Sequence, residues 1–237
     1  MKKWDLFIYF VFQSAFMSNR NSSLDAIQDI RSMMDRSSRF ISLSGLSGVA
    51  AGCCALVGAF FAYQVIYNSG GVAYEVEQGY GNDRAGYGVN MLKNFMGQQL
   101  FWIAALTFVA AFLLAFLFTW MRSRKQQIPV WGTMAKKLTW NVLLPMVAGG
   151  VFLLKLIEAG AFGLIAPGCL LFYGIALVNG SRFTVGEIRY LGYAIIVLGL
   201  INCWFPGYGL YFWAAGFGLL HIVYGIVMWN KYERGAE

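Results

Sequence analysis

The residues of this 237-residue chain that could do chemistry are few, and they lie in apolar surroundings. His221 is the only histidine, and its neighbours are Leu220 and Ile222. An imidazole in such a position can donate a hydrogen bond to a backbone carbonyl of another helix. It can also serve as a haem ligand, a proton relay or a pH sensor. The sequence leaves these roles open, although one histidine offers a cofactor only one ligand.

Lys155 and Glu158 form a candidate pair at the end of an apolar stretch. Residues three apart on a helix lie on one face, where opposite charges can pair. Ionisable side chains within a membrane are costly and often functional, so an ion or proton site is the alternative to a local ion pair. With His221, these residues define the polar path that a transporter would need.

Motifs of several enzyme classes are absent from the sequence. The chain contains neither a phosphate-binding loop nor the H-E-x-x-H motif of zinc proteases. It has no serine within a G-x-S-x-G turn. The spacing of its four cysteines is not typical of a metal or redox site. We therefore expect no catalytic residues, no metal site and no cofactor.

The elements that position these residues are predicted to be membrane helices. Hydrophobic residues make up 59% of the chain and charged residues 12%, whereas soluble domains are about one quarter charged. A bilayer core about 30 Å thick needs roughly 20 apolar residues per helix. The sequence thus predicts an all-α polytopic membrane protein with six transmembrane helices and an N-terminal cytoplasmic amphipathic helix. The predicted spans are Ser42–Tyr67, Leu100–Met121, Leu138–Ile157, Phe162–Val178, Ile188–Trp204 and Tyr208–Trp229.

Positive charge is distributed unequally across this topology. Fifteen of the eighteen Lys and Arg residues fall on one side, and only Arg84, Lys93 and Lys155 fall on the other. Because cytoplasmic loops carry an excess of Lys and Arg, both termini are predicted in the cytoplasm, in an inner (cytoplasmic) membrane. The net charge of +7 is spread over loops, which argues against nucleic-acid binding. The expected partners are membrane lipid and either a second copy or another membrane protein.

Three parts are predicted along the chain: a cytoplasmic arm at 1–41, a transmembrane domain at 42–230 and a cytoplasmic tail at 231–237. Apolar residues recur at helical spacing within 22–40, which predicts the amphipathic helix. Residues 1–16 have the composition of a signal peptide. An equally favoured interpretation is that translation starts at Met17, so that residues 1–16 are upstream sequence that is not translated. The segment 68–99 is the only sizeable external loop in this topology, and it is rich in Gly and Tyr.

Small and polar residues predict how the spans pack. Ser44, Gly48 and Gly52 are four residues apart, so they share one helix face on which another backbone can approach closely. Packing within the chain is favoured over dimerisation at this face. Other polar residues are expected to form hydrogen bonds between helices. These are Gln64, Asn141, Asn179 and Asn202.

Two segments resemble an uncharacterised family of small bacterial integral membrane proteins. They are GEIRYLGYAIIVLGLINCWFPGYGLYFWAAGFGLLHIVYG at Gly186–Gly225 and IRSMMDRSSRFISLSGLSGVAAG at Ile30–Gly52. The resemblance implies a membrane topology but no activity. Members similar to this chain sometimes carry the label of a carotenoid-cleaving monooxygenase. Those enzymes resemble soluble propellers with four iron-binding histidines, and the single histidine here does not support the label.

Two functions of different class are consistent with these features. The favoured hypothesis is a non-enzymatic regulatory, sensory or scaffolding component of the membrane. The alternative is a small transporter or permease subunit that uses Lys155, Glu158 and His221. Convergence of these three residues on one cavity would favour transport, and their separation would favour the first hypothesis.

Overall fold

The computed structural model describes residues 45–68, 97–125, 131–232 and 234. Every described residue belongs to one compact unit, Phe40–Glu237. Several predictions lie outside the described residues. These concern the cytoplasmic arm, its helix at 22–40, the start at Met17, Ser44 and most of the external loop.

The described part of the chain is helical and contains no strand. Its main helices are α2 (Gly45–Asn68), α4 (Gln99–Lys125), α5 (Thr133–Glu158), α6 (Ile165–Gly180), α7 (Ile188–Trp204) and α9 (Leu220–Tyr232). The short helix η1 (Phe162–Leu164) precedes α6, and three short helices lead into α9. These three are η2 (Pro206–Tyr208), α8 (Gly209–Trp213) and η3 (Ala214–Leu219).

Each of the six predicted spans coincides with an apolar helix, so the predicted all-α polytopic fold is confirmed. Five of these helices are long and apolar enough to cross a membrane, counting Phe162–Gly180 and Pro206–Tyr232 as continuous. The sixth, α7, is equally apolar but has 17 residues. That length is at the lower limit of about 17–25 residues for a membrane span.

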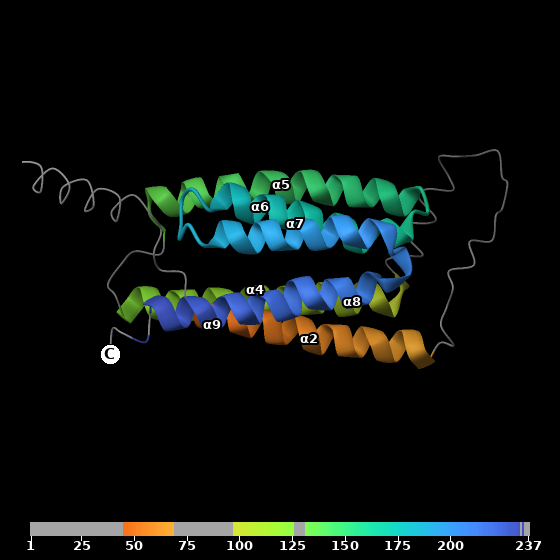
Figure 1. Cartoon of the computed structure of the whole chain (residues 1–237), viewed down its shortest axis with the longest axis horizontal. Helices are drawn as coiled ribbons and strands as arrows, with labels where there is room; N and C mark the ends of the chain where they lie inside the picture. Colours follow the sequence, from red (N-terminus) through yellow and green to blue (C-terminus); the bar gives the residue numbers. More distant parts are fainter. Residues whose placement is uncertain (1–44, 69–96, 126–130, 233, 235–237) are drawn as a thin grey trace, which may run out of the picture. The chain divides into compact units, whose positions relative to one another are not determined.

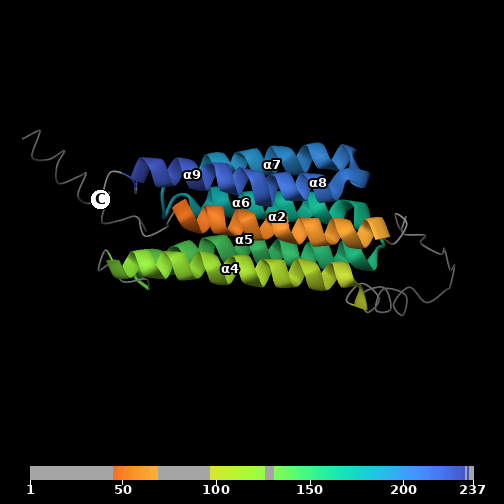
Figure 2. The same ribbon diagram turned by 90° about the horizontal axis from the view of Figure 1, so that it is seen from below.

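The helices form two layers that run along a common axis (Figures 1 and 2). In the first layer, α6 lies between α5 and α7 and packs against both. In the second layer, α2 lies between α4 and the continuous helix α8–η3–α9. The layers contact each other mainly where α6 and α7 meet α8, η3 and α9.

Small residues determine how closely the helices of a layer approach. A Cβ added to Gly225 would lie 2.6 Å from both the Gly45 carbonyl oxygen and the Val49 amide nitrogen, so α9 and α2 touch backbone to backbone. In the other layer, a Cβ added to Gly174 or to Gly192 would lie 2.9 Å from the carbonyl oxygen of the other glycine. Lipid tails are as apolar as leucine, so close packing of this kind is a main source of helix association in membranes.

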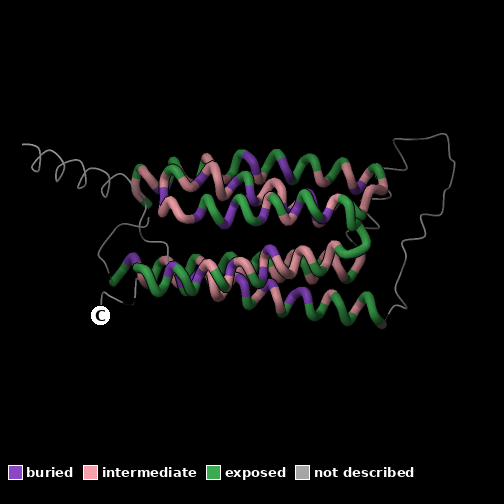
Figure 3. Tube along the Cα trace, in the orientation of Figure 1, coloured by how far each residue is buried: buried purple, intermediate pink, exposed green. Residues whose placement is uncertain are grey.

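The core lies between the layers, on the side formed by α6, α7 and α9, and Figure 3 shows buried positions along the helices of both layers. Leu170 and Ile195 have no exposed surface, and Leu191 is nearly as buried. Partly buried apolar side chains from both layers pack against these three. They are Tyr173, Leu177, Phe212, Phe217, Leu220 and Tyr224.

Helix α4 is packed very differently. It lies against α2, and Ser123 is its only buried residue among those described. Large apolar side chains are exposed around its circumference, including Leu106, Phe108 and Phe112, each more than 60% exposed. A helix that is hydrophobic all round is buried or spans a membrane. Most of the α4 surface is therefore apolar and suited to contact lipid or another membrane helix.

One end of the bundle, which we call the basic end, carries most of the described positive charge. α2, α5 and α7 begin there, and α4, α6 and α9 finish there (Figure 1). Lys155 lies at the opposite end, and every other described Lys or Arg belongs to the basic end. These residues are Arg122, Arg124, Lys125, Lys136, Lys137, Arg182, Arg189, Lys231 and Arg234.

Candidate functional site

His221 lies in the core, where both of its ring nitrogens are hydrogen bonded. Nδ1 is 2.9 Å from the carbonyl oxygen of Gly216, and Nε2 is 2.8 Å from the hydroxyl oxygen of Tyr173. A carbonyl only accepts hydrogen bonds, so Nδ1 carries the proton. In the neutral imidazole, Nε2 then accepts from the Tyr173 hydroxyl. Neither nitrogen is left free to bind a haem iron or another metal in this arrangement.

A π-helical segment places His221 for these bonds. In η3, the wider turn is marked by the backbone N–H of Leu220, which reaches back five residues to the carbonyl oxygen of Ala215. The bond from His221 to Gly216 spans five residues as well. Segments of this type are rare and frequently occur at functional sites. Gly216 lies so close to Leu170 of the other layer that a larger residue at position 216 would displace the Leu170 side chain.

Aromatic rings surround the histidine. The ring centroid of Tyr173 lies 5.0 Å from that of Phe217 and 5.5 Å from that of His221. Trp213 extends the cluster, with its ring centroid 5.1 Å from that of Phe217. His221 therefore joins α9 to α6 through one hydrogen bond and one ring contact, both with Tyr173.

Lys155 and Glu158 form an ion pair within the last turn of α5, with 2.5 Å between Nζ and Oε2. Their side chains are 72% and 29% exposed, at the end opposite the basic end. α5 is an outer helix of its layer and packs mainly against α6. The pair is therefore a local contact on the surface of the bundle.

The structure thus separates the three candidate polar residues. Lys155 and Glu158 lie together at one end of α5, whereas His221 is buried between α9 and α6. A pocket in the described part of the protein includes none of the three in its lining.

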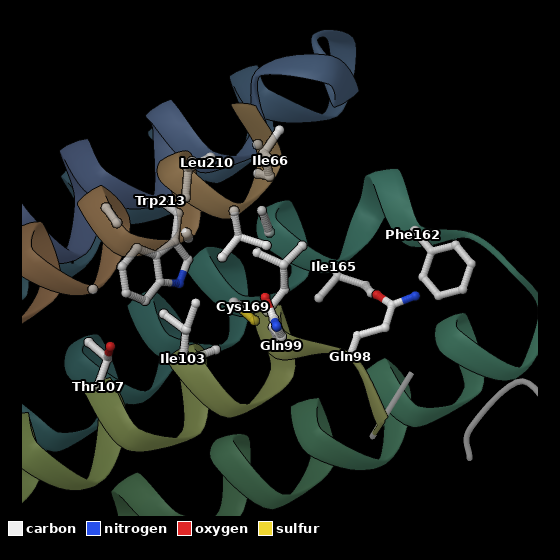
Figure 4. Close-up of a pocket in the computed structure, with 18 of the residues that line it drawn as sticks. Ile66, Gln98, Gln99, Ile103, Thr107, Phe162, Ile165, Cys169, Leu210 and Trp213 are labelled. Carbon is white, nitrogen blue, oxygen red and sulfur yellow. The ribbon is translucent and has the colours of Figure 1, made fainter. Parts of the chain in front are cut away.

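That pocket has a volume of about 820 Å³ and lies between the two layers, on the side of α4 (Figure 4). Its walls come from α2, α4 and α8 of the second layer and from η1 and α6 of the first, together with η2. Most of the lining residues are apolar or small. Gln98 and Phe162 lie at one end of the view in Figure 4, and Thr107 and Trp213 lie at the other. Sequence reasoning missed this site, because none of these residues belongs to a motif.

The asparagines behave differently from one another. The Asn179 side chain donates to the backbone carbonyl of Asn141 across α6 and α5, at 2.8 Å, as expected. The Asn141 side chain instead donates to Lys137 in its own helix. Asn202 is fully buried, and neither atom of its amide has a hydrogen-bond partner among the described residues. The prediction of an interhelical bond was therefore wrong for the Asn141 side chain, which bonds a carbonyl of its own helix, and for the Asn202 side chain, which has no partner among the described residues.

A second polar contact, at the basic end, was also missed. Glu187, which precedes α7, accepts hydrogen bonds from Lys231 at 2.5 Å and from Tyr232 at 2.6 Å. Partial burial alone would raise the pKa of the Glu187 carboxyl, but these two hydrogen bonds outweigh it and lower the pKa to about 2. The contact joins residues more than forty positions apart, so the sequence contains no local signal for it.

The small-residue face of α2 lies against α9. A Cβ added to Gly48 would be 3.3 Å from the Gly225 Cα, and one added to Gly52 would be 2.7 Å from the Gly218 carbonyl oxygen.

Among the described residues, no group of three His, Cys, Asp or Glu side chains is placed to hold a metal ion. The sequence matches no family model, and no curated protein or solved structure shows significant similarity to it.

Proposed function

We propose that this protein is a non-enzymatic component of the inner membrane, with a regulatory, sensory or scaffolding role. The observation that carries the proposal is the separation of its polar side chains. His221 is bonded through both ring nitrogens inside the core, and Lys155 and Glu158 neutralise each other on the surface. A transporter that uses these residues needs them on one path, and the described helices keep them apart.

The charge distribution supports an orientation with both termini in the cytoplasm. Lys155 is the one described Lys or Arg that does not belong to the basic end. Because positive residues accumulate in cytoplasmic loops, the basic end is assigned to the cytoplasm. The resemblance of two segments to small bacterial integral membrane proteins also predicts a membrane location.

Co-purification tests the proposed role. The protein and, as a control, its Gly150→Leu variant on the α5 surface are extracted in a mild detergent. Molecules bound to each are identified by mass spectrometry. A partner protein or lipid retained in constant ratio is expected for a scaffold or sensor. Solute or proton flux in proteoliposomes that is abolished by Glu158→Gln and by His221→Phe would contradict the proposal.

Cysteine accessibility tests the orientation. On a cysteine-free background, Ser181→Cys places a thiol at the basic end and Gly97→Cys places one at the opposite end. A membrane-impermeant maleimide added to intact cells should label residue 97 and leave residue 181 unlabelled until the membrane is permeabilised. The reverse pattern would show that the basic end faces outward.

A further inference from the structure

We propose that the pocket between α4 and α6 binds one acyl chain of a membrane phospholipid, with the lipid headgroup held near Gln98 and Gln99. This inference adds a ligand to the molecule and does not depend on whether the protein is a scaffold or a sensor. It rests on the polarity, depth and position of the pocket.

The polarity of the pocket fits a hydrocarbon chain. Its lining contains no Asp, Glu, Lys, Arg or His, and it is mostly apolar. Small residues from several elements form the walls, among them Ala62, Ala104 and Ala166. Its volume of about 820 Å³ lies within the range of roughly 300–1,000 Å³ that is typical of ligand pockets. A charged or strongly hydrated ligand would lose water in this pocket without gaining a charged partner.

Polar groups mark where the headgroup would lie. Gln99 is the first residue of α4 and Gln98 precedes it, at the end opposite the basic end, and both carry amides that line the pocket (Figure 4). Amide groups can donate to and accept from the ester and phosphate oxygens of a lipid. Thr107, at the other extreme, lies eight residues further along α4, which corresponds to a rise of roughly 12 Å. The pocket therefore extends less than halfway across a hydrocarbon core of about 30 Å.

The position of the pocket gives it access to the bilayer. α4 packs against α2, and within the described helices it makes no comparable contact with α5 or α6. The pocket wall formed by α4 is therefore continuous with an α4 surface that is apolar and exposed on its other sides. A lipid at that surface can place one chain between α4 and α6 without leaving the membrane.

Photo-crosslinking tests the site. The full chain is reconstituted in vesicles of phosphatidylethanolamine and phosphatidylglycerol that contain a trace of phosphatidylethanolamine with a diazirine in one acyl chain. After illumination, labelled peptides are mapped by mass spectrometry. We expect labels to concentrate on the pocket faces of α4 and α6, around Ile103 and Cys169, above the level on the open face of α4 at Phe108 and Phe112.

Two glycines that line the pocket have room for a larger side chain. An added Cβ meets no atom within 4 Å at Gly207 or at Gly97, and both residues line the pocket. Gly150 on α5 also has open space, but it does not line the pocket, so it is a matched control. Gly207→Phe and Gly97→Phe should each reduce labelling at Cys169 about tenfold, which corresponds to about 1.4 kcal/mol. Gly150→Phe should leave that labelling unchanged, and circular dichroism melts should show that all three variants fold.

Three results would overturn the assignment. One is labelling of Phe108 and Phe112 equal to that of the pocket, which indicates annular lipid only. Another is labelling at Cys169 that is the same in folded Gly207→Phe and Gly97→Phe as in the parent. The third is crosslinking of the pocket residues to a free diazirine fatty acid, or to residues 69–96 of the chain, in place of the phospholipid.

Discussion

The two sides of the helix bundle are built differently. On the closed side, α6 and α7 meet α8, η3 and α9 through fully buried side chains and the hydrogen bond between Tyr173 and His221. On the open side, α4 rests on α2, and a pocket separates it from α6. Both sides are made of apolar helices, so hydrophobicity alone does not explain the difference.

The comparison shows what holds membrane helices together in this protein. An apolar side chain gains little by leaving lipid for another helix, so association depends on close backbone approach and on polar bonds. On the closed side, Gly174 of α6 packs against Gly192 of α7 within one layer, and the hydrogen bond between Tyr173 and His221 joins the two layers. Among the described helices, α4 packs closely on α2 alone, where the Thr107 side chain lies against Gly58, and no polar bond or close contact joins it to α6 in the same way.

The largest effect is expected from filling a backbone contact beside the closed side. In Gly52→Leu, the added Cβ would lie 2.7 Å from the Gly218 carbonyl oxygen and 3.0 Å from the Ile222 amide nitrogen, so α2 must move away from α9. We expect a loss of about 3 kcal/mol or more in the free energy of unfolding, the upper part of the range for overpacked sites. SDS titration in mixed micelles, followed by circular dichroism, measures this loss.

Gly48→Leu should cost less than Gly52→Leu, because its added Cβ is 3.3 Å from the nearest backbone atom. Gly150→Leu, with open space around the residue, is the control and should match the parent. Equal stability of Gly52→Leu and Gly150→Leu would show that the contact between α2 and α9 does not limit stability.

Removing a large side chain should affect the two sides unequally. Leu170 is completely buried between the layers, whereas Leu106 on α4 is 67% exposed. Leu170→Ala leaves a cavity, and we expect a cost of about 2 kcal/mol, the lower end of the range for such substitutions. The lower end applies because transfer of the leucine side chain from lipid to the protein interior contributes little to the free energy of unfolding. Leu106→Ala should change the free energy of unfolding by less than about 0.5 kcal/mol.

The measurement for this pair is again SDS titration. A Leu106→Ala loss as large as that of Leu170→Ala would mean that α4 packs against something more than lipid, such as a second copy. In that case, the two sides would differ in their partners and not in their degree of packing.

The polar bond of the closed side should contribute less than the packing. Tyr173→Phe removes the hydroxyl and leaves His221 Nε2 without its partner at 2.8 Å. Hydrogen bonds between membrane helices contribute about 0.6 kcal/mol on average and up to about 1.7 kcal/mol, so we expect a loss near 1 kcal/mol. A double-mutant cycle with His221→Phe measures the coupling directly. Additive losses would show that the two side chains do not interact energetically.

The sequence predicted the helices well and the sites poorly, for a physical reason. A membrane span is a local property of about 20 consecutive residues, and all six predicted stretches coincide with apolar helices. The bond between Tyr173 and His221 joins positions 48 residues apart. The pocket requires five or more elements to be placed at once. Neither arrangement leaves a periodic pattern in the chain, so only the lone histidine drew attention to the core.

The smallest expected effect concerns the ion pair that fastens the closed side at the basic end. Glu187 accepts hydrogen bonds from Lys231 and Tyr232, and these bonds bring its pKa in the folded protein to about 2, below the ordinary value of 4.5. A group whose pKa is lower in the folded state stabilises the fold at pH values above its unfolded pKa. The contribution of Glu187 should therefore be complete above about pH 4.5. It should disappear as the pH falls toward 2.

Thermal melts between pH 6 and pH 2 test this dependence. Glu187→Gln should lower the melting temperature slightly at pH 6 and match the parent near pH 2, because exposed ion pairs contribute little to stability. Glu158→Gln is the control on the open side. Its partner Lys155 lies in the same helical turn, so no contact between helices is lost, and its curve should follow that of the parent. A Glu187→Gln curve parallel to the parent at every pH would show that the contact with α9 is not maintained in the membrane protein.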